Sequence, residues 1–165
     1  HLFGVPYDRI DVVVHPGSIV HSLVEFVDGA LLAQMGTPDM RIPLQYAISG
    51  EKHWPLVSGR LNLVETGTLR FEEPDLVRFP CLRLALAAGR QGGTAPIVLN
   101  AANEVAVAAL LNHKIRYADI PRVIEDCLTA LPVGPVTDLE TALAVDVQAR
   151  READGHVDRL VASAG

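Results

Sequence analysis

Two histidines and two serines lie close together near the start of the chain, in the segment HPGSIVHS at residues 15–22. A catalytic dyad of Ser18 with His21 would need an orienting carboxylate and an oxyanion hole, and the sequence shows neither. A zinc site is equally weak, because the two histidines need a third ligand that no nearby motif supplies. From residue type alone, a packed or capping role is favoured for both histidines.

A second polar segment, PDMR at residues 38–41, places a thioether and a guanidinium at the start of a predicted helix. Met40 and Arg41 could contact a flat ring or an anion in a neighbouring cleft. Residue type alone favours the simpler interpretation, in which Met40 fills core and Arg41 is solvated.

Other polar groups carry less chemistry. The acidic run at residues 72–75 is typical of a solvated turn that caps the next helix. Asn100 and Glu104 lie one helical turn apart, so we interpret them as a packing pair. A glycine-rich nucleotide loop, a HExxH pair, a nucleophile elbow and a cluster of acids for a divalent cation are absent from the sequence. We therefore assign no metal ligand, and a free-standing enzyme is hard to build from these residues.

The elements that would position these side chains begin with a hairpin. Two apolar runs, Ile19–Val27 and Ala30–Met35, flank Asp28-Gly29, which predicts a two-residue turn with Glu25 opposite Leu32. Both faces of this hairpin are largely apolar, so each face needs a cover. We expect a partner subunit to supply part of it.

A short helix is predicted to follow the hairpin, from the N-cap Thr37 to about Ile48, with Pro38 in its first position. Residues 49–75 then lose the apolar period. Their glycines and prolines indicate a linker with short extended pieces such as Leu61–Val64.

Helical periodicity returns for the rest of the chain. It predicts helices over residues 76–88, from Thr94 or Ala95 to Asn112, over residues 119–131 and over residues 137–162. Asp119 should cap the third, and Thr137 with Glu140 should form a capping box on the fourth. Gly155 indicates a break or kink in the last helix.

These elements predict an α+β chain in three parts. Residues 1–48 would be part of a mixed β-sheet with a hairpin and a short helix, residues 49–75 an extended linker, and residues 76–165 a domain resembling a four-helix bundle.

Composition narrows the function classes. Net charge −6 disfavours binding to a phosphate backbone, so nucleic acid is not expected as a partner. The apolar runs are far shorter than the roughly 20 residues of a membrane span, so no membrane insertion is expected. Cys81 and Cys127 lack paired spacing and are interpreted as reduced core thiols.

A family resemblance is carried by two long segments, DVVVHPGSIVHSLVEFVDGALLAQMGTPDMRIPLQYAI and FPCLRLALAAGRQGGTAPIVLNAANEVAVAALLNHKIRYADIPRVIE. They resemble 1-deoxy-D-xylulose 5-phosphate reductoisomerases, and the final LAVDVQARREA is similar to the last helix of that family. The resemblance runs in order along essentially the whole chain.

The resemblance implies an enzyme that rearranges 1-deoxy-D-xylulose 5-phosphate on a divalent metal (Mg, Mn or Co) and reduces the product with NADPH to 2-C-methyl-D-erythritol 4-phosphate. This reaction serves non-mevalonate isoprenoid biosynthesis. The family would have an NADPH domain, a central catalytic and dimerisation domain and a C-terminal helical domain. By that comparison, the cofactor loop, metal carboxylates and phosphate grip lie upstream of His1, and the chain, which lacks an initiator Met and a targeting signal, starts inside the central domain.

Two positions are matched to the family's motifs, both in supporting roles. His21 matches the second histidine of HPQSxxHS, near the active site, and Met40 matches the methionine of PDMR, near the nicotinamide. Gly17 departs from the family, which usually has Gln there, and glycine makes this bend more flexible.

We therefore expect the chain to be the C-terminal part of a homodimeric bacterial cytoplasmic enzyme, with a plastid as the alternative compartment. Alone it should be inactive and bind neither NADPH nor metal tightly. The alternative is a non-enzymatic module for dimerisation or interaction.

Overall fold

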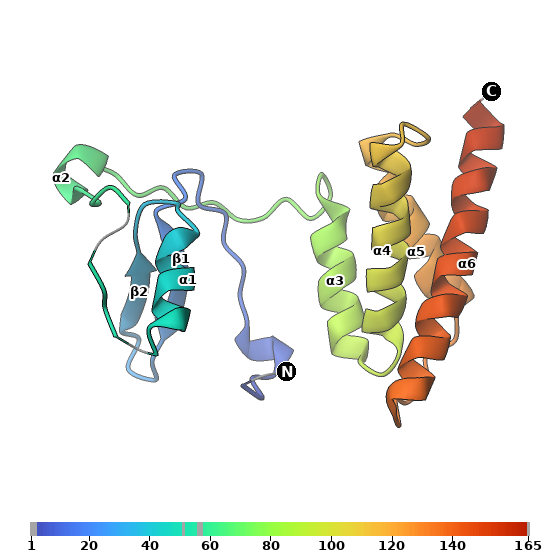
Figure 1. The fold of residues 1–165 in the computed structure, drawn as a ribbon, viewed down its shortest axis with the longest axis horizontal. Helices are drawn as coiled ribbons and strands as arrows, with labels where there is room; N and C mark the ends of the chain where they lie inside the picture. The colour runs from blue at the N-terminus through green and yellow to red at the C-terminus, as the bar shows by residue number, and fades with distance from the viewer. Residues whose placement is uncertain (1–2, 51, 56–57, 165) are drawn as a thin grey trace. The chain divides into compact units, whose positions relative to one another are not determined.

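The computed structural model describes residues 3–50, 52–55 and 58–164. The chain divides into two compact units (Figure 1). The hairpin unit comprises Asp11–Pro74, and the helical unit comprises His1–Ile10 together with Asp75–Gly165. The three-part division at residues 48 and 75 stays a prediction.

The hairpin consists of β1 (Val20–Glu25) and β2 (Leu31–Met35), paired antiparallel. The expected register is wrong by one residue, because Glu25 lies opposite Leu31 instead of Leu32. The Gly29 amide donates to the Phe26 carbonyl, and Gly29 adopts φ +81°. Asp-Gly therefore belongs to a three-residue loop, a turn closed by a left-handed glycine, and not to the two-residue turn that the same dipeptide also favours.

One residue of β1 has no partner across the hairpin. The pairing changes register between Val20, opposite Met35, and Ser22, opposite Gln34, which leaves His21 as the extra residue of a β-bulge. A bulge turns a side chain away from the strict alternation of a strand, and so re-aims the imidazole.

Helix α1 runs from Arg41 to Ile48, and the expected start at Thr37 is wrong. The N-cap position is Met40, and the carboxylate of Asp39 just before it accepts from the Arg41 amide at 2.9 Å, which satisfies one free amide at the helix start. The later start places Pro43 in the first turn, where its missing N–H costs no hydrogen bond. The expected start would have placed Pro43 in the helix interior.

The described residues between 49 and 75 form one short helix, α2 (Leu63–Thr66), where an extended piece was expected over Leu61–Val64. The Asn62 side chain accepts from the amides of Val64 and Glu65 and starts this turn. A bridge between Val14 and Glu72 ties the end of the segment to the chain before the hairpin.

The described residues of the hairpin unit include no buried side chain. On one face of the hairpin, Val24 and Leu32 are 54% and 64% exposed, and on the other, Leu23 and Leu31 are 41% and 63% exposed. A two-stranded hairpin with both faces open is marginal in water, so this exposure agrees with the expected need for a cover, which stays a prediction.

The described part of the helical unit contains four main helices, and the expectation of four is confirmed. They are α3 (Pro80–Gln91), α4 (Ala95–Leu111), α5 (Ile120–Ala130) and α6 (Leu139–Ala164). Two single 3₁₀ turns, η1 (Tyr7–Arg9) and η2 (Tyr117–Asp119), complete it. Together with the antiparallel hairpin, they make the chain α+β, as the sequence predicts.

Three details of these helices differ from expectation. Helix α3 begins at Pro80 instead of residue 76, because Asp75 caps a separate turn through the amides of Val77 and Arg78. Helix α6 is capped by Asp138, whose carboxylate accepts from the Thr141 amide at 2.7 Å, and not by Thr137. Helix α6 also continues through Gly155 without a break.

Asp119 stands at the N-cap position of α5 without capping it. Its carboxylate instead accepts from the Arg116 amide at 3.0 Å and pairs with the guanidinium groups of Arg116 and Arg122. These ion pairs offset the cost of burying the Asp119 carboxylate, which is only 5% exposed.

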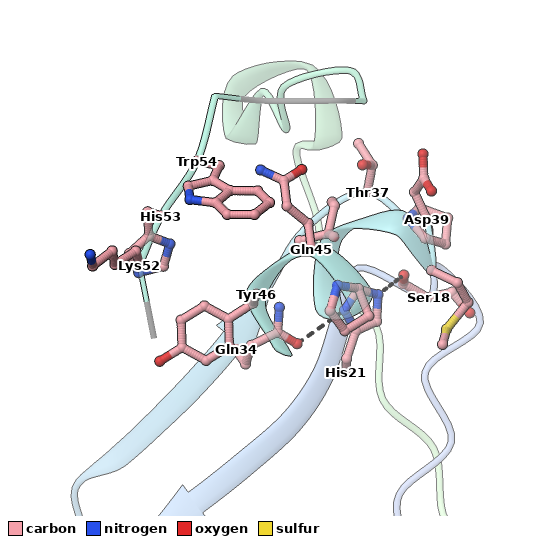
Figure 2. A pocket seen from close by; sticks show the side chains of 14 residues that line it. Ser18, His21, Gln34, Thr37, Asp39, Gln45, Tyr46, Lys52, His53 and Trp54 are labelled. Atoms are coloured by element: carbon pink, nitrogen blue, oxygen red, sulfur yellow. Dashed lines mark hydrogen bonds between the residues drawn. The ribbon is translucent and has the colours of Figure 1, made fainter. Parts of the chain in front are cut away.

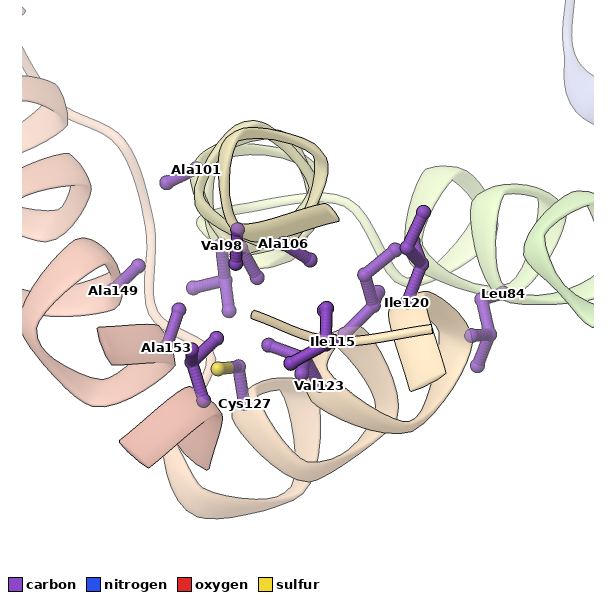
Figure 3. Packing of buried hydrophobic residues seen from close by; sticks show 14 residues of the cluster. Leu84, Val98, Ala101, Ala106, Ile115, Ile120, Val123, Cys127, Ala149 and Ala153 are labelled. Atoms are coloured by element: carbon purple, nitrogen blue, oxygen red, sulfur yellow. The ribbon is translucent and has the colours of Figure 1, made fainter. Parts of the chain in front are cut away.

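The core of the helical unit is rich in alanine (Figure 3). Ala101 and Ala106 of α4, and Ala149 and Ala153 of α6, are fully buried. Small side chains at a helix contact permit close approach of the axes. Arg150 of α6 joins the two helices at the surface, with its guanidinium 2.6 Å from Glu104 of α4. Asn100 also donates to Glu104, so the expected packing pair is confirmed.

Cys127 lies in this core and is fully buried, whereas Cys81 is exposed at the start of α3. The interpretation of both cysteines as core thiols is therefore wrong for Cys81. Within the described ranges, the structure has no helix that is long and apolar enough to cross a membrane.

Candidate functional site

The hairpin unit contains a pocket of about 950 Å³ (Figure 2). Its walls come from the open end of the hairpin, from the loop and helix that follow, and from the segment after α1. The lining residues are Ser18, His21, Gln34, Thr37, Pro38, Asp39, Met40, Ile42, Pro43, Gln45, Tyr46, Lys52, His53 and Trp54. Both residues matched to family motifs, His21 and Met40, therefore lie in one pocket.

The imidazole of His21 is bonded at both nitrogens. Nε2 lies 2.9 Å from the carbonyl oxygen of Ser18, and Nδ1 lies 3.1 Å from the side-chain oxygen of Gln34. Figure 2 shows the ring held between these two partners. The hydroxyl of Ser18 is not the partner, so a Ser-His dyad is not formed.

His15 points to a different environment. Its Nδ1 lies 2.7 Å from the carbonyl oxygen of Arg70, and its ring stacks on Phe71 with centroids 4.7 Å apart. His15 thus has the packed role that residue type favours for a histidine in this segment. The two histidines of HPGSIVHS do not converge on one ligand.

Three residues of the PDMR segment, Pro38, Asp39 and Met40, also line the pocket. Met40 is 71% exposed and does not fill a core, which corrects the simpler interpretation of this residue. The Arg41 guanidinium is 2.6 Å from Asp39, and its hydrogen bonds hold the pKa of the Asp39 carboxyl below its usual range. Because the Arg41 guanidinium is already paired with the Asp39 carboxylate, it is less available to bind an incoming anion.

The sequence did not indicate the wall of the pocket that is formed by Gln45, Tyr46, His53 and Trp54. Gln45 donates to the Pro55 carbonyl at 3.0 Å, and the ring of Tyr46 lies 5.3 Å from that of His53. Trp54, the single tryptophan of the chain, is half exposed beside them. A lone tryptophan in a polar linker was the signal that could have indicated this wall.

The chemistry of the pocket is that of binding. It offers a thioether and aromatic rings for a flat apolar group, with amide, imidazole and hydroxyl groups at the edges. Among the described residues, no three His, Cys, Asp or Glu side chains converge as metal ligands. These residues alone therefore do not fit a divalent metal, and no metal step is assigned to them.

Comparison with known proteins identifies the family. A family model described as DXP reductoisomerase C-terminal domain matches residues 35–152. The 1-deoxy-D-xylulose 5-phosphate reductoisomerases of Methylobacillus flagellatus and Ralstonia nicotianae are 53% and 50% identical, over 92% and 94% of this chain. The chain spans about 40% of the length of these curated relatives.

Solved structures agree with the sequence relatives. A DOX-P reductoisomerase in complex with NADPH, fosmidomycin and magnesium is 41% identical, with a TM-score of 0.91, over 97% of this chain and 41% of that one. The Zymomonas mobilis 1-deoxy-D-xylulose 5-phosphate reductoisomerase in complex with NADPH is 39% identical, with a TM-score of 0.88, over 95% of this chain and 42% of that one. The chain therefore belongs to the 1-deoxy-D-xylulose 5-phosphate reductoisomerase family.

Proposed function

We propose that this chain forms one wall of the active site of a 1-deoxy-D-xylulose 5-phosphate reductoisomerase. The whole enzyme would convert 1-deoxy-D-xylulose 5-phosphate to 2-C-methyl-D-erythritol 4-phosphate with NADPH and a divalent metal. The observation that carries the proposal is that the family-matched His21 and Met40 line the same pocket, in a chain that superimposes on an NADPH- and magnesium-bound relative.

Met40 is proposed to contact the nicotinamide ring. A thioether is polarizable and packs favourably on the face or edge of a flat ring. Its large exposure leaves the side chain free to meet a cofactor held by another part of the enzyme. When bound, the nicotinamide would supply the hydride, and Met40 would contribute orientation of the ring and exclusion of water.

His21 is proposed to face the substrate beside this ring. Two hydrogen bonds fix the His21 imidazole at the pocket wall, and this supports a role in which the imidazole positions the substrate or makes a polar contact with it. The metal, when bound, would polarise the substrate oxygens through ligands outside the described residues.

A homodimer and a bacterial cytoplasmic location complete the proposal. The open hairpin faces support dimerisation, because their apolar area needs a cover. The curated relatives named above are bacterial, which supports the cytoplasm, with a plastid as the alternative compartment.

The test is a chimera in which this chain replaces the matched region of the Methylobacillus flagellatus relative, at 53% identity. With 1-deoxy-D-xylulose 5-phosphate and Mg²⁺, we expect the chimera to oxidise NADPH at a rate within about tenfold of the relative, since ~1.4 kcal/mol corresponds to one factor of ten. A folded, dimeric chimera without turnover would overturn the proposal.

Two substitutions connect this activity to the pocket. His21→Asn in the chimera should lower kcat/KM by about 10- to 100-fold, as loss of one or two polar contacts does. The matched control is His113→Asn in the helical unit, outside the pocket lining. His113 has φ +58°, a conformation that Asn tolerates well, so this control should keep full activity.

The second candidate function is a non-enzymatic dimerisation module, which the exposed hairpin faces favour. It predicts a chain that self-associates while the chimera stays inactive. Sedimentation of the chain, combined with the turnover assay, separates the two functions.

A further inference from the structure

The side chain of Gln34 has a single recorded hydrogen-bond partner among the described residues, and that partner is His21. Gln34 lies on β2 opposite Ser22, one residue along β1 from the bulged His21. It is the polar residue in an otherwise apolar strand, LLAQM. A strand side chain that is polar, exposed to the pocket and bonded to one ring calls for a reason beyond packing.

The second partner of the ring is set by the backbone. Ser18 adopts φ +48°, a conformation that costs a non-glycine residue free energy. In this conformation the carbonyl oxygen of Ser18 lies within hydrogen-bond distance of His21 Nε2. The carbonyl is fixed on the main chain, so it holds Nε2 whatever the side chain of residue 18 does. The orientation at Nδ1 is left to Gln34.

Proton counting shows why an amide suits this place. The Ser18 carbonyl only accepts, so Nε2 carries a proton in every state that keeps this bond. When the ring is charged, Nδ1 also donates, and the oxygen of Gln34 accepts. When the ring is neutral, Nδ1 accepts, and the amide meets it by a half-turn that presents its NH₂ group. A carboxylate could serve only the first state, and an alkyl group neither.

We propose that Gln34 is a positioning residue that keeps the His21 imidazole in one orientation in both protonation states. The proposal rests on the proposed function for its catalytic consequence. Its structural half, the bond to Nδ1, stands on the geometry of this pocket alone. Gly36 borders the pair, since a β-carbon built there would lie 4.0 Å from the Gln34 amide nitrogen and 4.0 Å from His21 Cε1.

The experiment uses the chimera with isotope-labelled histidine and follows the ring nitrogens of His21 by NMR, assigned through their loss in His21→Asn. The unsubstituted chimera should give one set of ring signals with Nε2 protonated. Gln34→Leu should split or broaden them and shift Nδ1, because this nitrogen loses its partner. Gln34→Glu keeps an accepting oxygen at similar reach, so it should restore a single set of signals only while the ring is charged.

Gln45→Leu is the matched control for the ring signals. It removes another amide of the same pocket, which bonds the Pro55 carbonyl and not the ring. It should leave the His21 nitrogens unchanged. Unchanged signals in Gln34→Leu, or equal changes in Gln45→Leu, would overturn the positioning role.

Steady-state kinetics distinguish positioning from a merely structural role, because loss of a structural residue would not lower kcat alone. Gln34→Leu should lower kcat by about tenfold, with an unchanged KM for NADPH and an unchanged melting temperature, and Gln34→Glu should recover part of kcat. An equal fall in thermal stability and in all kinetic constants would contradict positioning. If the chimera has no turnover at all, the proposed function fails, and the ring signals still decide the role of Gln34.

Discussion

The ring of Tyr7 occupies the space that a side chain at Gly89 would need. A β-carbon built on Gly89 in α3 would collide with two ring carbons and the hydroxyl oxygen of Tyr7. Glycine inside a helix costs about 0.5–1 kcal/mol relative to alanine, so a packing contact must offset this cost. The 3₁₀ turn that carries Tyr7 therefore packs on α3 through a position where only glycine fits.

Two glycine substitutions should change stability in opposite directions. Gly89→Ala should lower the free energy of unfolding by about 1–3 kcal/mol, because overpacking exceeds the gain in helix propensity. Gly155→Ala in α6 should raise it by about 0.5–1 kcal/mol, because its β-carbon meets only the flexible end of Arg159, at 3.5 Å. Urea unfolding of the chain, followed by circular dichroism, measures both.

The assignment of the first effect to Tyr7 has its own check. Tyr7→Ala alone should destabilise the chain, but the further change Gly89→Ala should then be nearly neutral. Purely additive losses in the double variant would show that Tyr7 is not the cause.

Acid should weaken the helical unit partly through Asp119. Hydrogen bonds from Arg116 hold the pKa of this carboxyl below its ordinary value of 3.8. A carboxyl with a lowered folded pKa contributes stability that is fully present above pH 3.8 and is lost as the pH falls through the folded pKa. We expect Asp119→Asn to be less stable at neutral pH and to lose less stability on acidification than the unsubstituted chain.

The loss of stability in acid is measured from the urea midpoints of the Asp119→Asn variant and the unsubstituted chain, at several pH values from neutrality to below 3.8. Arg116→Met, which removes the principal partner, should flatten the acid dependence in the same direction. Parallel pH curves for all three proteins would rule out Asp119 as a source of acid sensitivity.

The two thiols should react very differently. Burial raises the pKa of Cys127 to about 12, and its side chain is fully covered, so the reactive thiolate is neither formed nor reachable. Cys81 is exposed, although partial desolvation also raises the pKa of its thiol. A thiol reagent at mildly alkaline pH should therefore modify Cys81 alone in the folded chain, faster as the pH rises, and both thiols in urea.

Cys81→Ser gives the control for this experiment, since it should abolish labelling of the native chain. Rapid labelling of native Cys81→Ser would mean that the core around Cys127 opens easily.

The open hairpin faces should support dimerisation of the chimera. Val24→Lys with Leu32→Lys places charges on one face, and Leu23→Lys with Leu31→Lys places them on the other. We expect at least one double variant to sediment as a monomer, because a desolvated lysine without a partner is costly in an interface. Dimers in both cases would exclude the hairpin faces as the contact.

The sequence could predict the helices of the bundle because their buried alanines and branched residues repeat with the helical period. It could not fix the register of the hairpin, since Asp28-Gly29 suits loops of two and of three residues. The bulge at His21 has no local signature, and it is the feature that brings this ring to Gln34. For the pocket, matching to the family's motifs supplied His21 and Met40. The wall with Gln45 and Tyr46 could not be predicted, because it depends on contacts of α1 with the segment that follows it.

The claim that this chain forms the nicotinamide wall can be measured on its two methionines. Methyl groups of Met35 and Met40, labelled with ¹³C in the chimera, report on their surroundings during titration with NADPH. Met40 lines the pocket and Met35 does not, so Met35 is an internal control. We predict that the Met40 methyl signal shifts as NADPH saturates the enzyme, while Met35 stays in place. Saturation with NADPH that leaves the Met40 signal unmoved would contradict the account.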